Sequence, residues 1–250
     1  ILYAGSYGMM GAAVLSASGA LRAGVGKLTV CSPKCGYTIM QSSVPEAMYH
    51  YNRGEMNIVD IRPERSFNAI GIGTHELTVK ALEDFLATIN QPIVLDADAL
   101  NCIAIKPSML NTIPVLSVLT PHAGEFDRMF GPQTSGEARL RTAIEKAKYY
   151  NIFIILKGHY TAIVRPDGKV YFNSSGTPAL ATPGSGDVLT GILLAMLAQG
   201  YPAELASIIA VYIHGLAGEM AAAEHGEYGV LAGDIAANVG RAIKEVMAMK

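Results

Sequence analysis

Residues 181–200 read ATPGSGDVLTGILLAMLAQG, a glycine-rich loop followed directly by an apolar helix pattern. The first turn of a helix leaves backbone N–H groups unpaired, and the helix dipole favours negative charge there. Gly184 and Gly186 would let an anion approach those N–H groups closely. Asp187 stands at the same place, where a carboxylate either caps the helix or takes a proton from a bound molecule. The stretch therefore predicts a buried helix that begins at an anion site.

Upstream of this loop, short apolar runs alternate with helix patterns. The runs are typical of buried strands because they are short and almost continuously apolar. They are ILYA (1–4), GKLTVC (26–31), FNAIGIG (67–73), PIVLDA (92–97), VLSVLT (115–120) and IFIILKG (152–158). Helix patterns cover 11–23, 76–89 and 136–150. This alternation predicts a doubly wound α/β fold, with a mostly parallel central sheet flanked by helices on both faces.

The pattern changes after residue 158. YTAIVRPDGKVYFNSS (160–175) predicts a hairpin that turns at residues 166–168, Pro-Asp-Gly. The remaining chain predicts helices over 187–199, 202–223 and roughly 231–248. No linker, repeat or low-complexity segment divides the sequence, so we expect residues 1–250 to form a single domain.

Composition and charge exclude several kinds of partner. The net charge is −2 and the pI is near 6.3, so we expect neither nucleic acid nor an anionic membrane as a partner. The apolar run 205–213 is too short to span a bilayer. Cys31, Cys35 and Cys102 form neither a disulfide framework nor a complete metal site, so we expect reduced cysteines and a cytoplasmic location. The chain begins inside a strand pattern without methionine, and we expect residues upstream of Ile1.

The segment GSGDVLTGILLAMLAQG (184–200) resembles the anion hole and catalytic aspartate of the ribokinase-like superfamily. More narrowly, it resembles the ADP/ATP-dependent NAD(P)H-hydrate dehydratases. Four further segments resemble that family, in the family's order: GSYGMMGAAVLSASGALRAGVGKLTV (5–30), VLDADALN (94–101), LTPHAGEFDRMFG (119–131) and ILKGHYTAIVRPDG (155–168). The resemblance covers nearly the whole chain. It implies a ribokinase-like fold and a lyase that repairs hydrated NADH or NADPH with ADP or ATP and Mg²⁺. Some members have an epimerase partner domain, and we expect one as a candidate upstream of residue 1.

The resemblance also implies roles for individual residues. Asp187 is the expected catalytic base and a substrate contact. The other expected substrate-binding residues are Ala12, Gly73, Asp98, Asn101, His122 and Glu125. The expected nucleotide-binding residues are Lys157, Gly158, His159, Tyr160 and Thr161 in a KGxxT segment, and Gly184, Ser185 and Gly186 in the anion hole. The ligands of Mg²⁺ stay unassigned.

The residues alone support part of this assignment. His122, Glu125, Asp96 and Asp98 follow predicted strands, and the carboxyl ends of strands are where open α/β sheets bind ligands. A purely structural interpretation stays open for Asp96, Asp98 and Lys157. Asp96 or Asp98 would cap the helix after its strand, and Lys157 would be a solvated side chain in a surface turn.

Several positions depart from the family pattern, among them Thr177, which stands where the family has asparagine in a Gly-Asn-Pro triplet. One histidine needs a separate interpretation. Pro183 stands where the loop commonly has glycine, which removes one N–H donor, and Ser185 replaces threonine. His75 stands where a further glycine is usual. His214 and Glu219 are five residues apart in a predicted helix, so we expect a packed histidine with a hydrogen-bond partner rather than a metal ligand.

The expected reaction is phosphoryl transfer to the substrate hydroxyl, followed by elimination of phosphate. The nearest alternative is a small-molecule kinase of the hydroxyethylthiazole-kinase type, which has the same fold and a similar GxGD loop. A second alternative is a nucleotide sensor without turnover. We expect small-molecule substrates and a homo-oligomer that associates through the helical C-terminal quarter. The sequence leaves open whether ADP or ATP is preferred, and whether the substrate is hydrated NADH or NADPH.

Overall fold

The computed structural model describes residues 1–63, 66–74 and 77–248. Within them, nine strands form one sheet in the order β3-β2-β1-β4-β5-β6-β7-β8-β9. The strands from β3 to β7 in this order are parallel to their neighbours, whereas β8 and β9 are antiparallel. The strands are β1 (Leu2–Tyr3), β2 (Thr29–Pro33), β3 (Met48–Asn52), β4 (Gly71–Thr74), β5 (Val94–Ala97), β6 (Val118–Leu119), β7 (Phe153–Leu156), β8 (Ala162–Val164) and β9 (Val170–Phe172).

The sheet grows in two directions from β1. The chain first adds β2 and β3 on one side of β1, and then returns to add β4 to β7 on the other side. All seven parallel strands therefore present their carboxyl ends at one edge of the sheet. That edge is where doubly wound sheets bind their ligands. The predicted doubly wound, mostly parallel sheet is confirmed.

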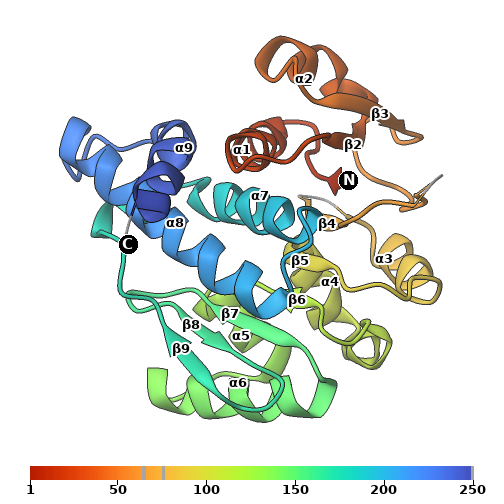
Figure 1. The fold of residues 1–250 in the computed structure, drawn as a ribbon. Helices are drawn as coiled ribbons and strands as arrows, with labels where there is room; N and C mark the ends of the chain where they lie inside the picture. The colour runs from red at the N-terminus through yellow and green to blue at the C-terminus, as the bar shows by residue number, and fades with distance from the viewer. Residues whose placement is uncertain (64–65, 75–76, 249–250) are drawn as a thin grey trace.

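Helices cover both faces of the sheet (Figure 1). In the central strands, successive residues alternate between two apolar cores; in β5, Val94 belongs to one core and Leu95 to the other. The first core is closed by α1 (Met10–Arg22), α7 (Ser185–Ala198), α8 (Ala203–His225) and α9 (Ala232–Ala248). The second core is closed by α3 (Val79–Leu86), α4 (Asp98–Ile105), α5 (Ala123–Phe130) and α6 (Gly136–Tyr150). A further helix, α2 (Tyr37–Ser43), adds Met40 to the first core. Strands buried on both faces are continuously apolar, as the sequence indicates.

The packing of α7 against α1 determines where α7 begins. A Cβ atom on Gly191 would lie 2.0 Å from the carbonyl oxygen of Ser16, and one on Gly19 would lie 2.6 Å from that of Val188. Glycine at both positions lets the two helix backbones approach closely, since any side chain would clash. The contact fixes the first turn of α7 relative to the sheet.

The elements match most of the predictions. β8 and β9 form the predicted hairpin, whose turn includes Gly168 at a φ of 85°. The C-terminal helices also lie where the sequence places them. β3 was not predicted because it is a largely exposed edge strand without an apolar run. The helix predicted over 76–89 is α3, and the predicted start at residue 76 lies outside the described residues.

Three further helices, α2, α4 and α5, were not among the predicted helix patterns. α4 and α5 are short and follow β5 and β6 almost directly. Their apolar residues follow those of the strands without a break, so the strand and helix periodicities cannot be separated in the sequence.

Among the described residues, α8 alone has the length and apolar composition of a membrane-crossing helix, with a mean hydropathy of 1.5 in its apolar window. However, 61% of that window is buried inside the structure. Core helices of folded domains pass the same test of length and composition, and burial in the first core favours this interpretation. The expected absence of a membrane partner stays a prediction.

Candidate active site

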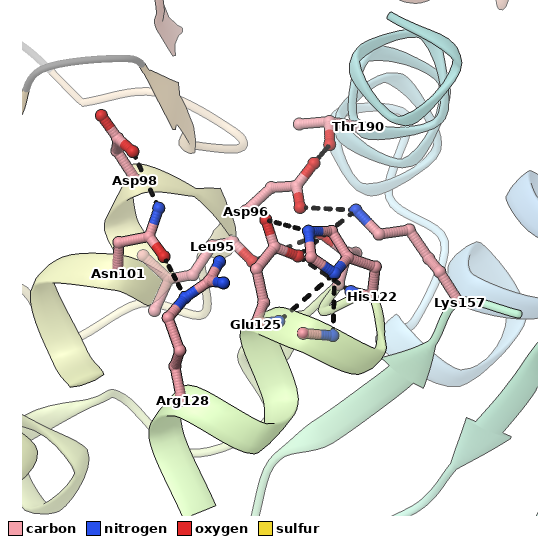
Figure 2. Close-up of polar contacts among 11 residues, drawn as sticks. Leu95, Asp96, Asp98, Asn101, His122, Glu125, Arg128, Lys157 and Thr190 are labelled. Atoms are coloured by element: carbon pink, nitrogen blue, oxygen red, sulfur yellow. Dashed lines mark hydrogen bonds and ion pairs between the residues drawn. The ribbon is translucent and has the colours of Figure 1, made fainter. Parts of the chain in front are cut away.

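Parallel strands bring charged side chains together beside the start of α7 (Figure 2). Asp96 lies near the end of β5, beside Gly73 of β4 in the sheet register. Lys157 directly follows β7 and forms an isolated bridge with His122, which follows β6. A Cβ on Gly73 would lie 3.5 Å from Thr190 of α7, so this glycine also borders the group. The carboxyl edge of the sheet therefore meets the predicted anion loop, as the sequence indicates.

The backbone at the start of α7 requires glycine. Gly184 is the N-cap residue and has a φ of 88°, in the left-handed region that favours glycine. A Cβ there would lie 2.4 Å from Leu15 of α1. No side chain of the described residues caps this helix end. The Ser185 N–H donates to the Thr182 carbonyl oxygen at 3.3 Å, whereas the next N–H groups of the first turn stay available to an anion.

Asp187 lies in the first turn of α7 but does not cap the helix, so that alternative is wrong. Within residues 1–63, 66–74 and 77–248, no hydrogen bond or ion pair reaches its carboxylate. Burial raises the pKa of Asp187 to about 7, and the negative charges of Asp96 and Glu125 add to this, whereas Lys157 opposes it. A carboxylate with this pKa exchanges protons near neutral pH, as a general base requires.

Asp96 is the centre of a buried network. Its side chain is 4% exposed, and its Oδ1 accepts a hydrogen bond of 2.9 Å from Lys157 Nζ. Its Oδ2 accepts one of 2.6 Å from the Thr190 hydroxyl of α7. Burial alone would raise the pKa of Asp96, but the Lys157 charge and hydrogen bonds from Thr190, Lys157 and Thr120 outweigh it and lower that pKa. Asp96 is therefore a paired carboxylate, and the alternative that it caps α4 is wrong.

Lys157 is not a solvated surface lysine, because its side chain is only 20% exposed. Burial would lower its pKa, but the charges of Asp96 and Glu125, the hydrogen bond to Asp96 and the charge of Asp187 together raise it. Lys157 Nζ lies 3.9 Å from Glu125 Oε2. Lys157 is thus held as a cation between carboxylates. Its predicted role at the nucleotide stays a prediction.

His122 and Glu125 cap α5 together. His122 Nδ1 accepts the N–H groups of Gly124 and Glu125, and the Glu125 carboxylate accepts the His122 N–H at 2.8 Å. Nδ1 is therefore an acceptor, so Nε2 carries the proton. The His122 side chain is 54% exposed. Burial raises the pKa of Glu125, to which the Asp96 charge adds and which Lys157 opposes. The imidazole can reach a ligand, whereas Glu125 is a buried acid.

Asp98 and Asn101 form a separate chain of hydrogen bonds that ends on Arg128 (Figure 2). Asn101 donates to Asp98 Oδ1 at 2.9 Å and accepts from Arg128 Nε at 3.0 Å. Asp98 is the first residue of α4, but its side chain is not the cap; Ala97 is the N-cap residue, with a φ of 48°. Ala12 is buried in the first turns of α1. The substrate-binding roles predicted for these residues stay predictions.

A cavity of about 690 Å³ lies next to this group. Six of the residues predicted to bind nucleotide line it: Lys157, Gly158, His159, Thr161, Ser185 and Gly186. His122 and His214 line it as well. The other two predicted residues, Tyr160 and Gly184, do not line it, and Tyr160 is 72% exposed. The cavity joins the predicted nucleotide residues to the start of α7, and His214 contacts Ser185, which confirms a packed histidine with a hydrogen-bond partner.

Sequence reasoning missed three parts of the site. Thr190 was not predicted, although it lies three residues after Asp187 and so on the same helix face. The pairing of Asp96 with Lys157 joins residues 61 positions apart, and no local pattern reports it. Ser185 was assigned to the nucleotide, but its contact with His214 on α8 was not foreseen.

The fold and this edge define the class of protein. A ribokinase-like superfamily protein from Enterococcus faecalis has the same fold, with a TM-score of 0.76 over 98% of this chain and 86% of that chain, at 24% identity. A family model described as NAD(P)H-hydrate dehydratase matches residues 1–241. The chain therefore belongs to the NAD(P)H-hydrate dehydratase family.

Relatives of known name support this membership. An ADP-dependent (S)-NAD(P)H-hydrate dehydratase of Bacillus subtilis is 36% identical over 240 residues, which cover 94% of this chain and 85% of that protein. A bifunctional NAD(P)H-hydrate repair enzyme of Moorella thermoacetica is 37% identical over 245 residues, which cover 92% of this chain and 46% of that protein. The chain thus spans about half the length of the bifunctional relatives.

A crystal structure of a relative gives the same picture of the fold. The ADP/ATP-dependent NAD(P)H-hydrate dehydratase of B. subtilis, co-crystallised with ATP and Mg²⁺, superimposes with a TM-score of 0.84. The match is 33% identical and covers 98% of this chain and 88% of that chain.

Proposed function

We propose that this protein dehydrates hydrated NADH or NADPH, with ADP or ATP as phosphoryl donor. The observation that carries the proposal is Asp187, whose carboxylate has no partner among the described residues and a raised pKa, beside a helix start that is open to an anion. The names of the relatives support the substrate class, since they are dehydratases or repair enzymes of the same hydrated cofactors. The reaction makes the protein a lyase that acts on a carbon–oxygen bond.

The first step is phosphoryl transfer. The nucleotide occupies the cavity along residues 157–161, and its terminal phosphate lies on the N–H groups of residues 184–186. Asp187 takes the proton of the substrate hydroxyl while that oxygen attacks the terminal phosphorus. The bond from phosphorus to the bridging oxygen breaks, and the shortened nucleotide leaves. The helix start stabilises negative charge on the phosphoryl oxygens.

The second step is elimination. The bond from the substrate carbon to the phosphorylated oxygen breaks, and phosphate leaves with the electron pair. The lone pair of the ring nitrogen compensates the electron deficiency at carbon. Loss of a proton from the neighbouring carbon then restores the dihydronicotinamide ring. We assign no residue to this proton.

The residues fit a magnesium ion that arrives with the nucleotide better than one held by the protein alone. The described residues contain no cluster of three or more metal-ligating side chains. Both oxygens of Asp96 are already engaged by Lys157 and Thr190. Mg²⁺ in phosphoryl-transfer sites usually keeps phosphate and water ligands and needs only one or two carboxylates. Glu125 is also engaged, because its Oε2 accepts the His122 N–H at 2.8 Å and its Oε1 lies 3.5 Å from His122 Nε2. We therefore assign no side chain to the ion, which would neutralise charge on the phosphates.

The test is an absorbance assay. Hydrated NADH or NADPH is mixed with the protein, ADP or ATP, and Mg²⁺, and the near-ultraviolet band of the reduced cofactor is followed. We expect the band to return with release of inorganic phosphate. A stable phosphate ester would indicate a kinase of the hydroxyethylthiazole-kinase type instead. Nucleotide binding without any product would indicate a sensor.

We also propose a cytoplasmic, homo-oligomeric protein. The three cysteines are free thiols in the structure, which supports a reducing compartment. Apolar side chains of the C-terminal region are exposed, among them Leu205, Leu231 and Met247, which supports self-association there. Size-exclusion chromatography with light scattering tests the assembly; a monomer at micromolar concentration would reject it.

A further inference from the structure

Among the described residues, the group around Lys157 contains one ammonium ion and the carboxylates of Asp96, Glu125 and Asp187, so these carboxylates compete for it. Lys157 Nζ lies 2.9 Å from Asp96 and 3.9 Å from Glu125. Among the described residues, no ion pair joins Lys157 to Asp187. Lys157 therefore forms its close ion pair with Asp96, although its charge also interacts with that of Asp187.

The position of the ammonium ion relative to α7 is well defined. A Cβ atom on Gly186 would lie 3.3 Å from Lys157 Nζ. The ammonium ion thus lies against the first turn of α7, beside the N–H groups that would receive a phosphate. Lys157 also lines the cavity that we assign to the nucleotide.

The side chain of Asp96 is in turn held in place by a residue of α7. Thr190 is one helical turn beyond Asp187 and donates to Asp96 Oδ2 at 2.6 Å. With Lys157 on Oδ1, both oxygens of Asp96 are engaged, and the residue is 3% exposed. Rotation of the Asp96 side chain would break at least one of these bonds.

We propose that Asp96 is a positioning residue: together with Thr190, it holds the Lys157 ammonium ion at the first turn of α7 and prevents that ion from pairing with Asp187. The inference rests on the proposed function, because it takes Asp187 as the base. A carboxylate paired with an ammonium ion is a weaker base than an unpaired one. The same contact keeps Lys157 pointed at the phosphate site instead of into solvent.

The charged groups around Asp187 come from several elements. Asp96, Lys157 and Glu125 are the groups whose charges reach it. On the other elements packed around α7, β4 has no titratable residue in Gly71–Thr74, and α1 has only Arg22, in its exposed last turn. His214 of α8 is buried, and burial lowers its pKa to about 4, so it is neutral at pH 7. The charged side chains of α9 include Asp234 and Arg241, which pair with His225 and Glu224.

Three variants separate positioning from folding. Asp96→Asn removes the charge and keeps the shape, whereas Thr190→Val removes only the hydrogen bond to Asp96. Thr29→Val, at a buried threonine of β2 outside the site, is the matched control. The measured quantities are the pH dependence of kcat/KM, the KM for the nucleotide and the melting temperature.

In Asp96→Asn, we expect Lys157 to turn toward Asp187 and Glu125. The acid limb of the pH profile should then move to lower pH by about one unit, because a like charge is removed and an opposite charge approaches. The KM for the nucleotide should rise, and kcat should fall because the base is weaker. Thr190→Val should shift the limb in the same direction by less, and Thr29→Val should not shift it. A merely structural role would lower the melting temperature and leave the limb in place, which would overturn the inference.

A second measurement is independent of turnover. Carbon-13 NMR of labelled aspartate carboxyl groups, with Asp187→Asn for assignment, gives the pKa of Asp187 directly. We expect this pKa to fall in Asp96→Asn, or in Thr190→Val if the first variant does not fold. An unchanged pKa overturns the inference. If the wild-type protein fails to dehydrate the cofactor while the variants still lower the pKa of Asp187, the proposed function is rejected and the positioning role stands.

Discussion

The buried imidazole of His214 contacts Ser185 at two atoms. Its Nε2 lies 2.9 Å from the Ser185 carbonyl oxygen and 3.1 Å from the Ser185 hydroxyl. A carbonyl oxygen only accepts hydrogen bonds, so Nε2 must carry the proton. The Ser185 hydroxyl therefore accepts from Nε2, and its own proton stays free to donate. Because Ser185 lines the cavity, that proton can be donated to a ligand there.

The first prediction concerns His214. In His214→Ala, the buried Ser185 carbonyl loses its donor, which costs about 1–3 kcal/mol for a buried polar group. We expect a lower melting temperature and weaker ADP binding by calorimetry. His214→Gln retains an N–H donor and should recover part of both losses. Unchanged ADP affinity in His214→Ala would contradict an effect of this histidine on the anion loop.

The second prediction concerns the role of Asp187 in turnover. Asp187→Asn keeps the shape of the side chain but cannot accept the substrate proton. We expect kcat to fall by roughly 10²–10⁴-fold, the range for the loss of a positioned proton acceptor. Circular dichroism should show a folded variant, and ADP should still bind. Activity like that of the wild type would reject Asp187 as the base.

The third prediction concerns pH. Asp187 must be ionised to accept a proton, and its pKa is raised to about 7 by burial and by Asp96 and Glu125. We therefore expect kcat/KM to rise with pH and to level off above pH 7. The profile is measured in buffers of constant ionic strength. A profile already level at pH 5 would show that an ordinary carboxylate, or no carboxylate, controls the reaction.

The fourth prediction links the same carboxylate to stability. The pKa of Asp187 is 3.8 as an ordinary side chain and about 7 in the fold, so the folded state binds the proton more tightly. The stabilisation of the fold that goes with protonated Asp187 is fully present below pH 3.8, and it is lost as pH rises through 7 and the buried group ionises. Above pH 7, Asp187→Asn should therefore stabilise the protein by roughly 2–4 kcal/mol. The gain should shrink toward pH 5 in urea titrations, and a variant less stable at pH 8 would contradict it.

The fifth prediction tests the contact between α1 and α7. In Gly191→Ala, the new Cβ would lie 2.0 Å from the Ser16 carbonyl oxygen, so the helices must separate. We expect a loss of about 3 kcal/mol or more in the free energy of unfolding, at the upper end of overpacking effects. Gly233→Ala in α9 is the control, because nothing lies within 4 Å of its added Cβ. That variant should be neutral or slightly more stable, by up to about 1 kcal/mol.

The sequence by itself determined the kind of fold and the position of the anion loop. Apolar strands buried on both faces are visible as continuous runs, because neighbouring residues such as Val94 and Leu95 of β5 meet different cores. The loop before α7 is visible because Gly184 needs a left-handed φ that few other residues adopt. Such signals are local in the sequence, so they can be recognised without the structure. The exposed strand β3 has no such signal and was missed.

Only the tertiary structure decided which carboxylate pairs with Lys157. The sequence places Asp96, Glu125, Asp187 and Lys157 near one edge, but it does not rank the distances between them. The ranking depends on the register of β5 and β7 and on where the packing against α1 lets α7 begin. Electrostatic energies change steeply with distance and burial. The same four residues could therefore leave Asp187 either paired or free, and among the described residues the fold leaves it without a hydrogen-bond or ion-pair partner.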